Sequence, residues 1–535
     1  MNNMIHVNLR LFKALIAVSL TTTFFGLASF SQAVTPAPDG CYPGFTTAEG
    51  CNALAALTTG AGNTGVGWYA LFLDSTGSYN TGLGAGALTV NSADSNTAVG
   101  AAALLLNTTG TENTAIGTDA LVYNDIGDAN TAVGAFALFS NTEGVFNTGI
   151  GHNALFNNTT GETNTAVGAN ALLHNTIGET NTAVGVNALD NNTEGASNTA
   201  IGAGALFSNS MGHDNTAVGT TALASNTMGL SNTATGADAL SDNTTGQDNV
   251  AVGNGALSMN THGSQNTATG SQSLNSSTSS ENTADGFQAL FSTTTGGDNT
   301  GIGWQALFNN TSGADNTAVG RDALAMNTIG SNNIALGVGA GNGVTTGNNN
   351  IDIGNAGGGA NTIQIGDSQM ATFIAGISGV SVTGAPVVVN VFGQLGVAPS
   401  SQRFKDEIKT MDKASEAVLA LRPVTFHYRK EVDPAGTSQF GLVAEEVEKV
   451  NPDLIVRDKE GKAYSVRYDQ VNAMLLNEFL KEHRKMEHQE ATISELKKEI
   501  AGLASTVKDQ AAQIQKVSAQ IELNGPAPQT AQTRR

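Results

Sequence analysis

A repeated unit of 17 residues constrains the fold of this chain more than any other feature of the sequence. Asparagine begins eighteen successive units from Asn63 to Asn350, with fifteen spacings of 17 residues and two of 16. The unit reads Asn-Thr-(Ala/Gly)-(Val/Ile)-Gly-x-x-Ala-Leu and continues with a polar stretch that usually contains Asn-Thr and Gly. Self-similarity at such a short fixed period is typical of solenoids, in which one structural unit stacks on the next.

A single unit is too poor in large side chains to fold alone. Burying its one Val or Ile and its one Leu would contribute roughly 3–6 kcal/mol, whereas ordering the backbone of one unit costs on the order of 20 kcal/mol. Stacked units can fold, because each covers the apolar positions of its neighbour and pairs with its backbone. We therefore expect a mainly β chain: a parallel β-solenoid or β-roll rod over residues 63–366, then a small α+β domain and a C-terminal coiled-coil helix.

The places of the unit predict local structure. The glycine that fills the fifth place of all eighteen units suits a tight corner. The first-place asparagine suits either a turn with side-chain-to-backbone hydrogen bonds or an asparagine ladder along the stack. The Val/Ile step predicts a short strand, and the Ala-Leu step is compatible with a second strand or with a helical turn. Threonine fills the second place of fifteen units, so an ice- or glycan-binding threonine ladder is an alternative function.

Charge is distributed unevenly, and this excludes several classes of function. The chain carries a formal net charge of −21, and residues 34–399 hold 24 acidic residues against one basic residue, Arg321. A protein that binds nucleic acid or anionic lipid needs a basic patch, which this sequence lacks. The glycine-rich stretch 337–341 has no βαβ context for a dinucleotide, and the histidines of the repeats have no metal-ligand spacing. We expect no cofactor, no metal and no nucleic-acid partner.

Residues 1–33 have the pattern of a secretory signal peptide. Arg10 and Lys13 precede an apolar run at 14–30, and Ser31 and Ala33 follow at the spacing of a cleavage site. A membrane anchor is the alternative, although the apolar run is short for a span of roughly 20 residues. No later segment approaches that length. We therefore expect an exported protein, located outside the cell or at its surface, with no membrane span in the mature chain.

Two cysteines stand at the start of the predicted mature chain, in residues 34–62, which we interpret as an N-terminal cap. Cys41 and Cys51 are the two cysteines of the sequence, and an exported protein permits a disulfide between them. Two unpaired thiols are the alternative. A metal site is disfavoured because two thiols without nearby histidines do not supply four ligands.

The sequence changes character after the repeats. Residues 367–399 predict a β-rich connector, and residues 400–474 carry spaced motifs. These motifs are Ser400-Ser-Gln-Arg-Phe-Lys-Asp-Glu-Ile408, Leu421-Arg-Pro-Val-Thr-Phe-His-Tyr428, Phe440-Gly-Leu-Val-Ala-Glu-Glu-Val447 and Val466-Arg-Tyr468. Together they resemble the intramolecular chaperone domain of phage endosialidase tail spikes and related fibre proteins. The repeat region, with N-T-A-V-G at 164–168 and N-T-A-I-G at 198–202, is similar to the left-handed parallel β-roll heads of trimeric autotransporter adhesins.

The chaperone resemblance implies a self-cleaving domain. In that family the domain trimerises the fibre, assists its folding and cuts itself off before the serine of the opening motif. Position by position, this implies Ser400 as nucleophile, Lys405 as general base and the bond between Pro399 and Ser400 as the scissile bond, with Ser401 as an alternative nucleophile. A lysine can activate a serine when burial lowers its pKa. From the dyad residues alone, Ser400 is better explained as a helix cap and Lys405 as a solvated charge.

Three further residues are candidate supports of this site. They are Arg403, Glu445 and Glu446. The two glutamates could orient the dyad, and the alternative is that both are exposed charges on a helix. Any enzymatic activity would be intramolecular, that of a Ser-Lys autoprotease, because no other catalytic group of residues is evident.

The C-terminal residues carry an independent assembly signal. Placing Ile493 and every seventh residue after it at heptad position a puts apolar residues at most d positions. The a residues are Ile493, Ile500, Val507, Ile514 and Ile521, and the d residues are Leu496, Leu503, Gln510 and Val517. This pattern predicts a coiled coil over residues 475–523, with an amphipathic helix packed on its own domain as the alternative. The heptads leave the strand number open, and the resemblance implies a trimer. Residues 524–535 are predicted to be disordered.

These observations predict an exported, homotrimeric, adhesin-like fibre whose C-terminal domain is a self-releasing intramolecular chaperone. Its partners would be further copies of the chain and an unidentified host-cell, glycan or surface ligand. The alternatives are the ice- or glycan-binding threonine ladder and a purely structural spacer. A spacer is favoured where charged residues such as Asp285 and Arg321 interrupt the regular face.

Overall fold

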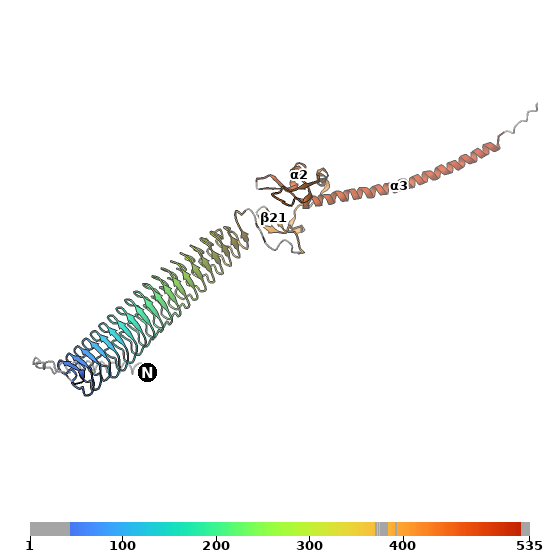
Figure 1. The fold of residues 1–535 in the computed structure, drawn as a ribbon. Helices are drawn as coiled ribbons and strands as arrows, with labels where there is room; N and C mark the ends of the chain where they lie inside the picture. Colours follow the sequence, from blue (N-terminus) through green and yellow to red (C-terminus); the bar gives the residue numbers. More distant parts are fainter. Residues whose placement is uncertain are drawn as a thin grey trace, which may run out of the picture. The chain divides into compact units, whose positions relative to one another are not determined.

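The computed structural model describes residues 43–369, 372, 374, 383–390, 393–458 and 460–525. The chain divides into two compact units, one ending at Ile374 and the other beginning at Ala375 (Figure 1). The predicted signal peptide, Cys41 and residues 526–535 lie outside the described residues, and what the sequence indicates for them stays a prediction.

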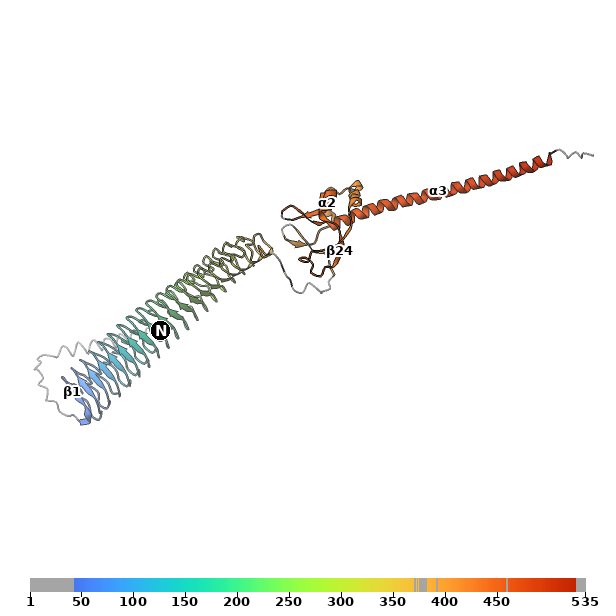
Figure 2. The same ribbon diagram turned by 45° about the horizontal axis from the view of Figure 1, so that its top comes forward.

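The first unit is a parallel β-solenoid. Its strands are three residues long and form one sheet of 20 strands, in which each strand pairs with the strands of the neighbouring turns (Figures 1 and 2). Pairing is in register, so that Thr199 lies beside Thr182 on one side and Thr216 on the other. The strands are β1 (Thr47–Glu49), β2 (Thr64–Val66), β3 (Thr81–Leu83), β4 (Thr97–Val99), β5 (Thr114–Ile116), β6 (Thr131–Val133), β7 (Thr148–Ile150), β8 (Thr165–Val167), β9 (Thr182–Val184), β10 (Thr199–Ile201), β11 (Thr216–Val218), β12 (Thr233–Thr235), β13 (Val250–Val252), β14 (Thr267–Thr269), β15 (Thr283–Asp285), β16 (Thr300–Ile302), β17 (Thr317–Val319), β18 (Ile334–Leu336), β19 (Ile351–Ile353) and β20 (Ile363–Ile365).

The predicted solenoid is confirmed, and the stack extends beyond the asparagine-initiated units at both ends. A 3-10 helix, η1 (Pro43–Phe45), precedes β1. β1 pairs in parallel with β2, so the stack begins within the segment interpreted as an N-terminal cap. At the other end, β20 pairs with β19 after a shorter connection. Threonine replaces the first-place asparagine before both end strands, at Thr46 and Thr362.

The solenoid core is made by different residues from those expected. The middle, third-place residue of a strand is buried, and the second- and fourth-place residues lie on the outer face. Ala166 and Ala200 are completely buried, whereas Ile201 is 42% exposed. The expectation that the fourth-place Val or Ile fills the core is wrong. Successive side chains of a strand point to opposite faces, so a three-residue strand directs one side chain inward.

The interior of each turn is therefore narrow and filled by small side chains and one leucine. The buried cluster consists of the third-place Ala, the eighth-place Ala and the ninth-place Leu of successive turns. This arrangement explains the three units without an aliphatic fourth residue. Thr235, Thr269 and Asp285 lie on the outer face of their strands and are exposed, so their polar groups stay in water and leave the core intact.

The Ala-Leu step is neither a second strand nor a helical turn. After β9, Asn187 and Leu189 both have left-handed backbone, with φ of 56° and 52°. Ala188 N–H donates to Gly185 O (3.4 Å), and Leu189 N–H donates to Ala205 O of the following turn (2.9 Å). Left-handed backbone is rare for leucine. The stack holds it there because the leucine side chain is completely buried and its N–H is paired.

Two buried asparagine ladders run along the stack. In the first-place ladder, which confirms the sequence expectation, Asn198 N–H donates to Asn181 Oδ1 (3.0 Å) and Asn198 Nδ2 donates to Gly212 O (2.8 Å). A second ladder, at the twelfth place, joins Asn192 Nδ2 to Asn175 Oδ1 (2.7 Å). Leaving such buried groups unpaired would cost about 1–3 kcal/mol each, so the ladders make the register of the turns specific.

Asp352 breaks the pattern of the core and leads to a testable prediction. It stands at the buried third place of β19, where β2 to β18 have Ala or Gly. Within the described part of the chain, neither of its carboxylate oxygens has a hydrogen-bond partner. Burial raises the pKa of the Asp352 carboxyl, because desolvation disfavours the charged form. We expect Asp352→Ala to stabilise the last turns by roughly 1–3 kcal/mol at neutral pH.

The gain should depend on pH in one direction. Because the pKa of Asp352 is raised on folding, the folded chain binds more protons than the unfolded chain, and wild-type stability falls as pH rises above about 4. The advantage of Asp352→Ala should therefore be largest near neutral pH and shrink below about pH 4. Thermal unfolding followed by circular dichroism measures it, with Asp285→Ala, at an exposed place, as the control. A variant no more stable than wild type at neutral pH would contradict the prediction.

The described part of the second unit consists of a hairpin, a small α+β domain and a long helix, as expected from the sequence. Its elements are β21 (Val388–Val389), β22 (Leu395–Gly396), η2 (Gln402–Phe404), η3 (Asp412–Ala420), β23 (Val424–His427), β24 (Ser438–Gly441), α2 (Ala444–Val450), η4 (Pro452–Leu454), β25 (Ile455–Arg457), β26 (Ala463–Val466) and α3 (Tyr468–Leu523). The strands form three separate antiparallel pairs. The core of the domain is small and consists of Val418, Val447, Leu454, Ile455, Val466, Val471 and Met474.

The long helix α3 is anchored in this domain at its N-terminal end. Buried Ser415 of η3 accepts a hydrogen bond from Asn477 Nδ2 (2.7 Å) and donates one to Glu478 Oε1 (2.5 Å). Lys481 Nζ also contacts Glu478 Oε1 (2.6 Å). All described residues of α3 after Lys481 are exposed, so this part of the helix is not packed on the domain.

Candidate functional site

The segment around the predicted cleavage point is exposed wherever the structure describes it. All described residues in 383–390 and 393–414 are exposed, although they include Val388, Phe404 and Ile408, which are 46–62% exposed. β21 and β22 pair with each other in this segment, and an isolated two-stranded hairpin is marginally stable in water. The apolar content of the segment therefore favours burial against another surface.

Ser400 and Lys405 are brought together by the short helix η2 (Gln402–Phe404). Lys405 N–H donates to Gln402 O (3.1 Å), which closes the turn, and Lys405 Nζ donates to Ser400 Oγ at 3.4 Å. The N-cap residue of η2 is Ser401, and its side chain makes no capping hydrogen bond. Ser400 thus faces the lysine, and it is not the residue that caps this helix.

Ser400 and Lys405 are close enough for the lysine to accept the serine proton. They lack the desolvated surroundings in which a lysine acts as a base. A lysine is an effective base when its amine is desolvated and neutral, and both side chains are exposed in the single chain. Pro399, which would supply the attacked carbonyl, is exposed as well. In the single chain the two side chains are therefore within hydrogen-bond distance of each other, and both remain exposed.

In the described part of the chain, none of the three predicted supporting residues forms a hydrogen bond or ion pair with the dyad. The Arg403 guanidinium lies 4.6 Å from the centre of the Phe404 ring, which is the geometry of a cation–π contact. Glu445 is exposed in the first turn of α2. Both residues therefore resemble surface charges in the single chain.

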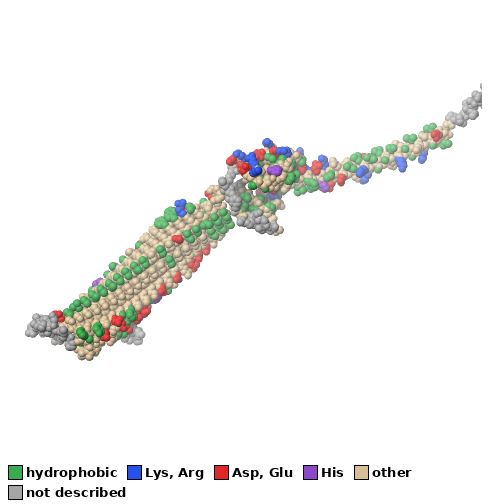
Figure 3. All heavy atoms as spheres, viewed as in Figure 1, with side chains coloured by type: hydrophobic (Ala, Val, Ile, Leu, Met, Phe, Trp, Pro, Cys, Tyr) green, Lys and Arg blue, Asp and Glu red, His purple; other side chains and the backbone are tan. Residues whose placement is uncertain are grey.

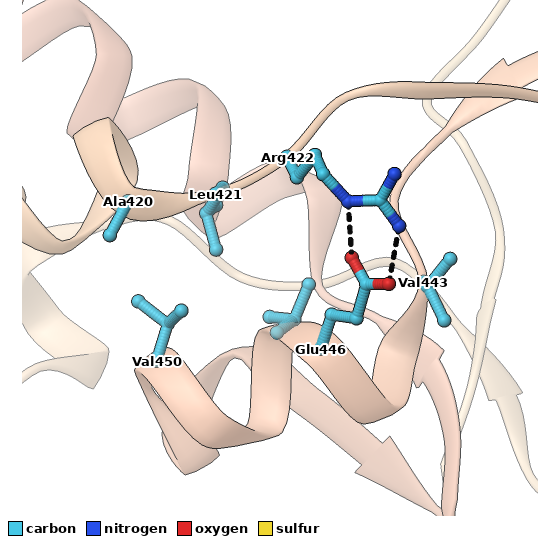
Figure 4. A pocket seen from close by; sticks show the side chains of 7 residues that line it. Ala420, Leu421, Arg422, Val443, Glu446 and Val450 are labelled. Atoms are coloured by element: carbon cyan, nitrogen blue, oxygen red, sulfur yellow. Dashed lines mark hydrogen bonds and ion pairs between the residues drawn. The ribbon is translucent and has the colours of Figure 1, made fainter.

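Glu446 is engaged by an arginine that the sequence analysis did not assign a role. Arg422 donates from Nε to Glu446 Oε2 (3.0 Å) and from Nη2 to Glu446 Oε1 (2.5 Å) (Figure 4). These hydrogen bonds lower the pKa of Glu446 and raise the pKa of Arg422. The pair lies beside a cavity of about 40 Å³ lined by Ala420, Leu421, Val443, Val447 and Val450. In the sequence, the position of Arg422 within the motif 421–428 is the one signal that could have pointed to a role for this residue.

The exposed part of α3 carries the predicted heptad pattern on one side. We call its apolar a and d residues the heptad seam. The seam consists of Ile493, Leu496, Ile500, Leu503, Val507, Ile514, Val517 and Ile521, which are 50–68% exposed. Eight large aliphatic side chains in a regular line on an otherwise polar helix form a surface for other helices.

The outer face of the solenoid sheet carries two parallel rows. The second-place threonines form one row, and the fourth-place aliphatic residues form the other, with Ile116 and Ile150 40–42% exposed. Rows of hydrophobic side chains follow the length of the solenoid in Figure 3. The threonine row is interrupted by Val250, Ile334 and Ile351. A regular hydroxyl row is therefore present on the outside, and its binding of ice or glycans stays a prediction.

Cys51 is exposed on the first turn of the solenoid, and the disulfide to Cys41 stays a prediction because Cys41 is not described. Among the residues that the structure describes, no group of three or more His, Cys, Asp and Glu side chains could hold a metal ion. Within the same residues, none of the helices combines the length and the apolar character of a membrane span.

Comparison with known proteins supports the reading of the C-terminal domain. Residues 400–456 match the model of a protein family described as chaperone of endosialidase. The match begins at Ser400 and ends within β25, so it covers the dyad, η3, the β23–β24 pair and α2. A search of the curated proteins and a search of the solved structures each returned no match.

Proposed function

We propose that this protein is an exported, homotrimeric, adhesin-like fibre whose C-terminal domain acts as an intramolecular chaperone and then releases itself by cleavage before Ser400. The β-solenoid is the fibre, and residues 400–456 match the chaperone family. The observation that carries the proposal is the exposed heptad seam of α3, because it is a surface without a function in a single chain.

The seam favours self-association on energetic grounds. Burying an exposed Val, Leu or Ile side chain contributes about 1.5–3 kcal/mol, and the seam offers eight such positions per chain. A lone helix in water is held only by its own weak propensity. Three copies of α3 would cover one another's seams, and the exposed segment 393–414 and the outer face of the solenoid would supply further apolar surface for contact between copies.

Self-association also gives the dyad a role in timing. Ser400 and Lys405 lie within reach of each other before assembly, and their exposure keeps the amine solvated. Contact between copies would remove water from the pair, which is the environment in which a lysine can act as a base, and would start cleavage after the fibre has formed. Release of residues 400–535 would make maturation irreversible, because the hydrolysed bond between Pro399 and Ser400 does not re-form.

Charging the seam should dissociate the fibre before it matures. In the Ser400→Ala background, which keeps α3 attached, Ile500→Asp together with Leu503→Asp places two charges at a and d positions. We expect a monomer in place of a trimer, because burying each unpaired charge costs several kcal/mol. Mass from light scattering after size-exclusion chromatography measures the change.

The matched control adds the same two residues outside the seam. Ser505→Asp together with Ala512→Asp adds the same two charges on the opposite side of the heptad and should keep the trimeric mass. If the Ser400→Ala parent itself is a monomer at micromolar concentration, or if both double variants dissociate equally, the proposed trimer is wrong.

A further inference from the structure

Each place of the repeat unit can be compared across the turns of the solenoid. At the sixth place, the residue type changes in three successive turns. The sixth place, directly after the corner glycine, holds no Phe, Tyr or Trp in the twelve turns from Ala85 to Ser271. Three successive turns then hold Phe287, Trp304 and Arg321. The sixth place of the first unit holds Trp68. Because the twelve turns in between fold without Phe, Trp or Arg at this place, such large side chains are not required by the solenoid.

The three side chains lie on consecutive turns of one surface. Gln305 N–H donates to Phe287 O (3.0 Å), and Asp322 N–H donates to Trp304 O (2.9 Å), so the sixth places are stacked one above another. The rings of Phe287 and Trp304 are nearly parallel, at 14°, with centroids 6.5 Å apart. Each ring is almost half exposed. Figure 3 shows basic atoms at one place on the solenoid, beside a group of hydrophobic side chains.

Polar groups adjoin the rings at the seventh place of the same turns. Gln288 Nε2 donates to Gln272 Oε1 (2.8 Å), and Gln305 Nε2 donates to Gln288 Oε1 (2.9 Å), which forms a short amide ladder. In the next turn Arg321 Nε lies 3.5 Å from Asp322 Oδ2. A guanidinium has five N–H donors, so this one contact leaves most of them available.

The combination matches the chemistry of a sugar. A pyranose ring has an apolar face of C–H groups, which packs on aromatic rings, and an edge of hydroxyls, which needs donors and acceptors side by side. Phe287 and Trp304 offer aromatic rings for the C–H face. The Arg321–Asp322 pair and the side-chain amide of Gln305 offer donors and acceptors for the hydroxyls. An apolar peptide or a second copy of the chain would leave these polar groups unpaired, at a cost of about 1–3 kcal/mol each.

Charge favours a neutral glycan. The Arg321–Asp322 pair has no net charge, and the surrounding residues 34–399 carry 24 acids against this one base. An anionic polysaccharide would approach against that field. We propose that Phe287, Trp304, Arg321 and Asp322 form a binding site for a neutral pyranose glycan. This inference names the ligand class of the adhesin-like fibre, and it rests on the proposed function only for the role of the binding.

The test uses the full-length Ser400→Ala protein, so that binding is measured independently of cleavage. Isothermal titration calorimetry at physiological ionic strength is run against three neutral polysaccharides, dextran, laminarin and galactomannan, and against alginate, a polyuronate. We expect saturable binding of at least one neutral polysaccharide, weakened at least tenfold by Trp304→Ala and by Arg321→Ala. Trp68→Ala removes the other exposed tryptophan, in a distant turn, and should leave the affinity unchanged.

Several outcomes would overturn the site. They are no binding of any of the three neutral polysaccharides, tighter binding of alginate, and an equal effect of Trp68→Ala. A fourth is a change of oligomeric mass in Trp304→Ala, because the surface would then be a contact between copies. If the protein binds a neutral glycan but is neither trimeric nor cleaved, the glycan site stands and the proposed maturation is wrong. The two proposals can therefore fail separately.

Discussion

Replacing Ser400 by alanine will leave the protein as one uncut chain, whereas the wild-type protein will separate into two fragments at the bond between Pro399 and Ser400. In the proposed reaction Ser400 Oγ attacks the carbonyl carbon of Pro399 and passes its proton, through Lys405, to the Ser400 nitrogen. The peptide bond breaks as the ester forms. Water then hydrolyses the ester, leaving a carboxylate on Pro399 and restoring the hydroxyl of Ser400.

Variants of the base make the test specific. Lys405→Arg keeps the positive charge, but arginine cannot deprotonate at accessible pH, so we expect cleavage to slow by about 100-fold or more, the size of a general-base contribution. Ser401→Ala should cleave like wild type, because Lys405 Nζ is hydrogen-bonded to Ser400. Intact-mass spectrometry of the purified proteins reads all of these results.

Two outcomes would contradict the dyad. A single full-length mass for the assembled wild-type protein would remove self-cleavage and leave the fibre in place. Cleavage that persists in Ser400→Ala and is lost in Ser401→Ala would move the nucleophile by one residue. Cleavage that needs assembly should also be absent from the seam variant Ile500→Asp/Leu503→Asp when it is made with Ser400 intact.

A single methyl group at Gly202 will break the solenoid in the middle of its length. Gly202 follows β10 with φ of 138°, a conformation that side chains rarely adopt, and a Cβ atom there would lie against Gly219 O, closer than two non-bonded atoms can approach. Backbone strain and overpacking together are expected to destabilise the turn by roughly 2–6 kcal/mol. Because each turn contacts its neighbours alone, the defect should uncouple the two halves of the stack.

The control lies two residues away in the same turn. Gly204 also has positive φ, at 66°, but the nearest atom to a Cβ there is Thr221 Cγ2 at 3.7 Å. Asn187 occupies the same place of the preceding unit with φ of 56°. We therefore expect Gly204→Asn to change stability by at most about 1 kcal/mol.

Denaturant unfolding and limited proteolysis measure the difference between these two glycines. Gly202→Ala should unfold in two steps and become sensitive to protease near β10, while Gly204→Asn should resemble the wild type. Equal behaviour of the two variants would show that the turns tolerate the collision, and the tight stacking described here would then be incorrect.

The candidate site was only partly predictable. Ser400 and Lys405 were identified through motifs shared with a family, and their contact follows from local chain geometry, since one short helical turn lies between them. The partner of Glu446 could not be identified in the same way. Arg422 is 24 residues away in sequence, and charges as abundant as those of residues 400–535 offer many pairings that sequence alone does not rank.

The sequence by itself determined that this chain is a stack of short turns, because no unit has enough apolar side chains to fold unless a neighbour covers it. It also determined where the stack gives way to a domain and a heptad helix. Only the tertiary structure decided which apolar residues are inside. Ala and Val are both apolar, and adjacent places on a strand must face opposite ways, so the outcome depends on the width of the interior. That interior accepts alanine and leucine from each turn and leaves valine and isoleucine on the surface, where they are available to other molecules.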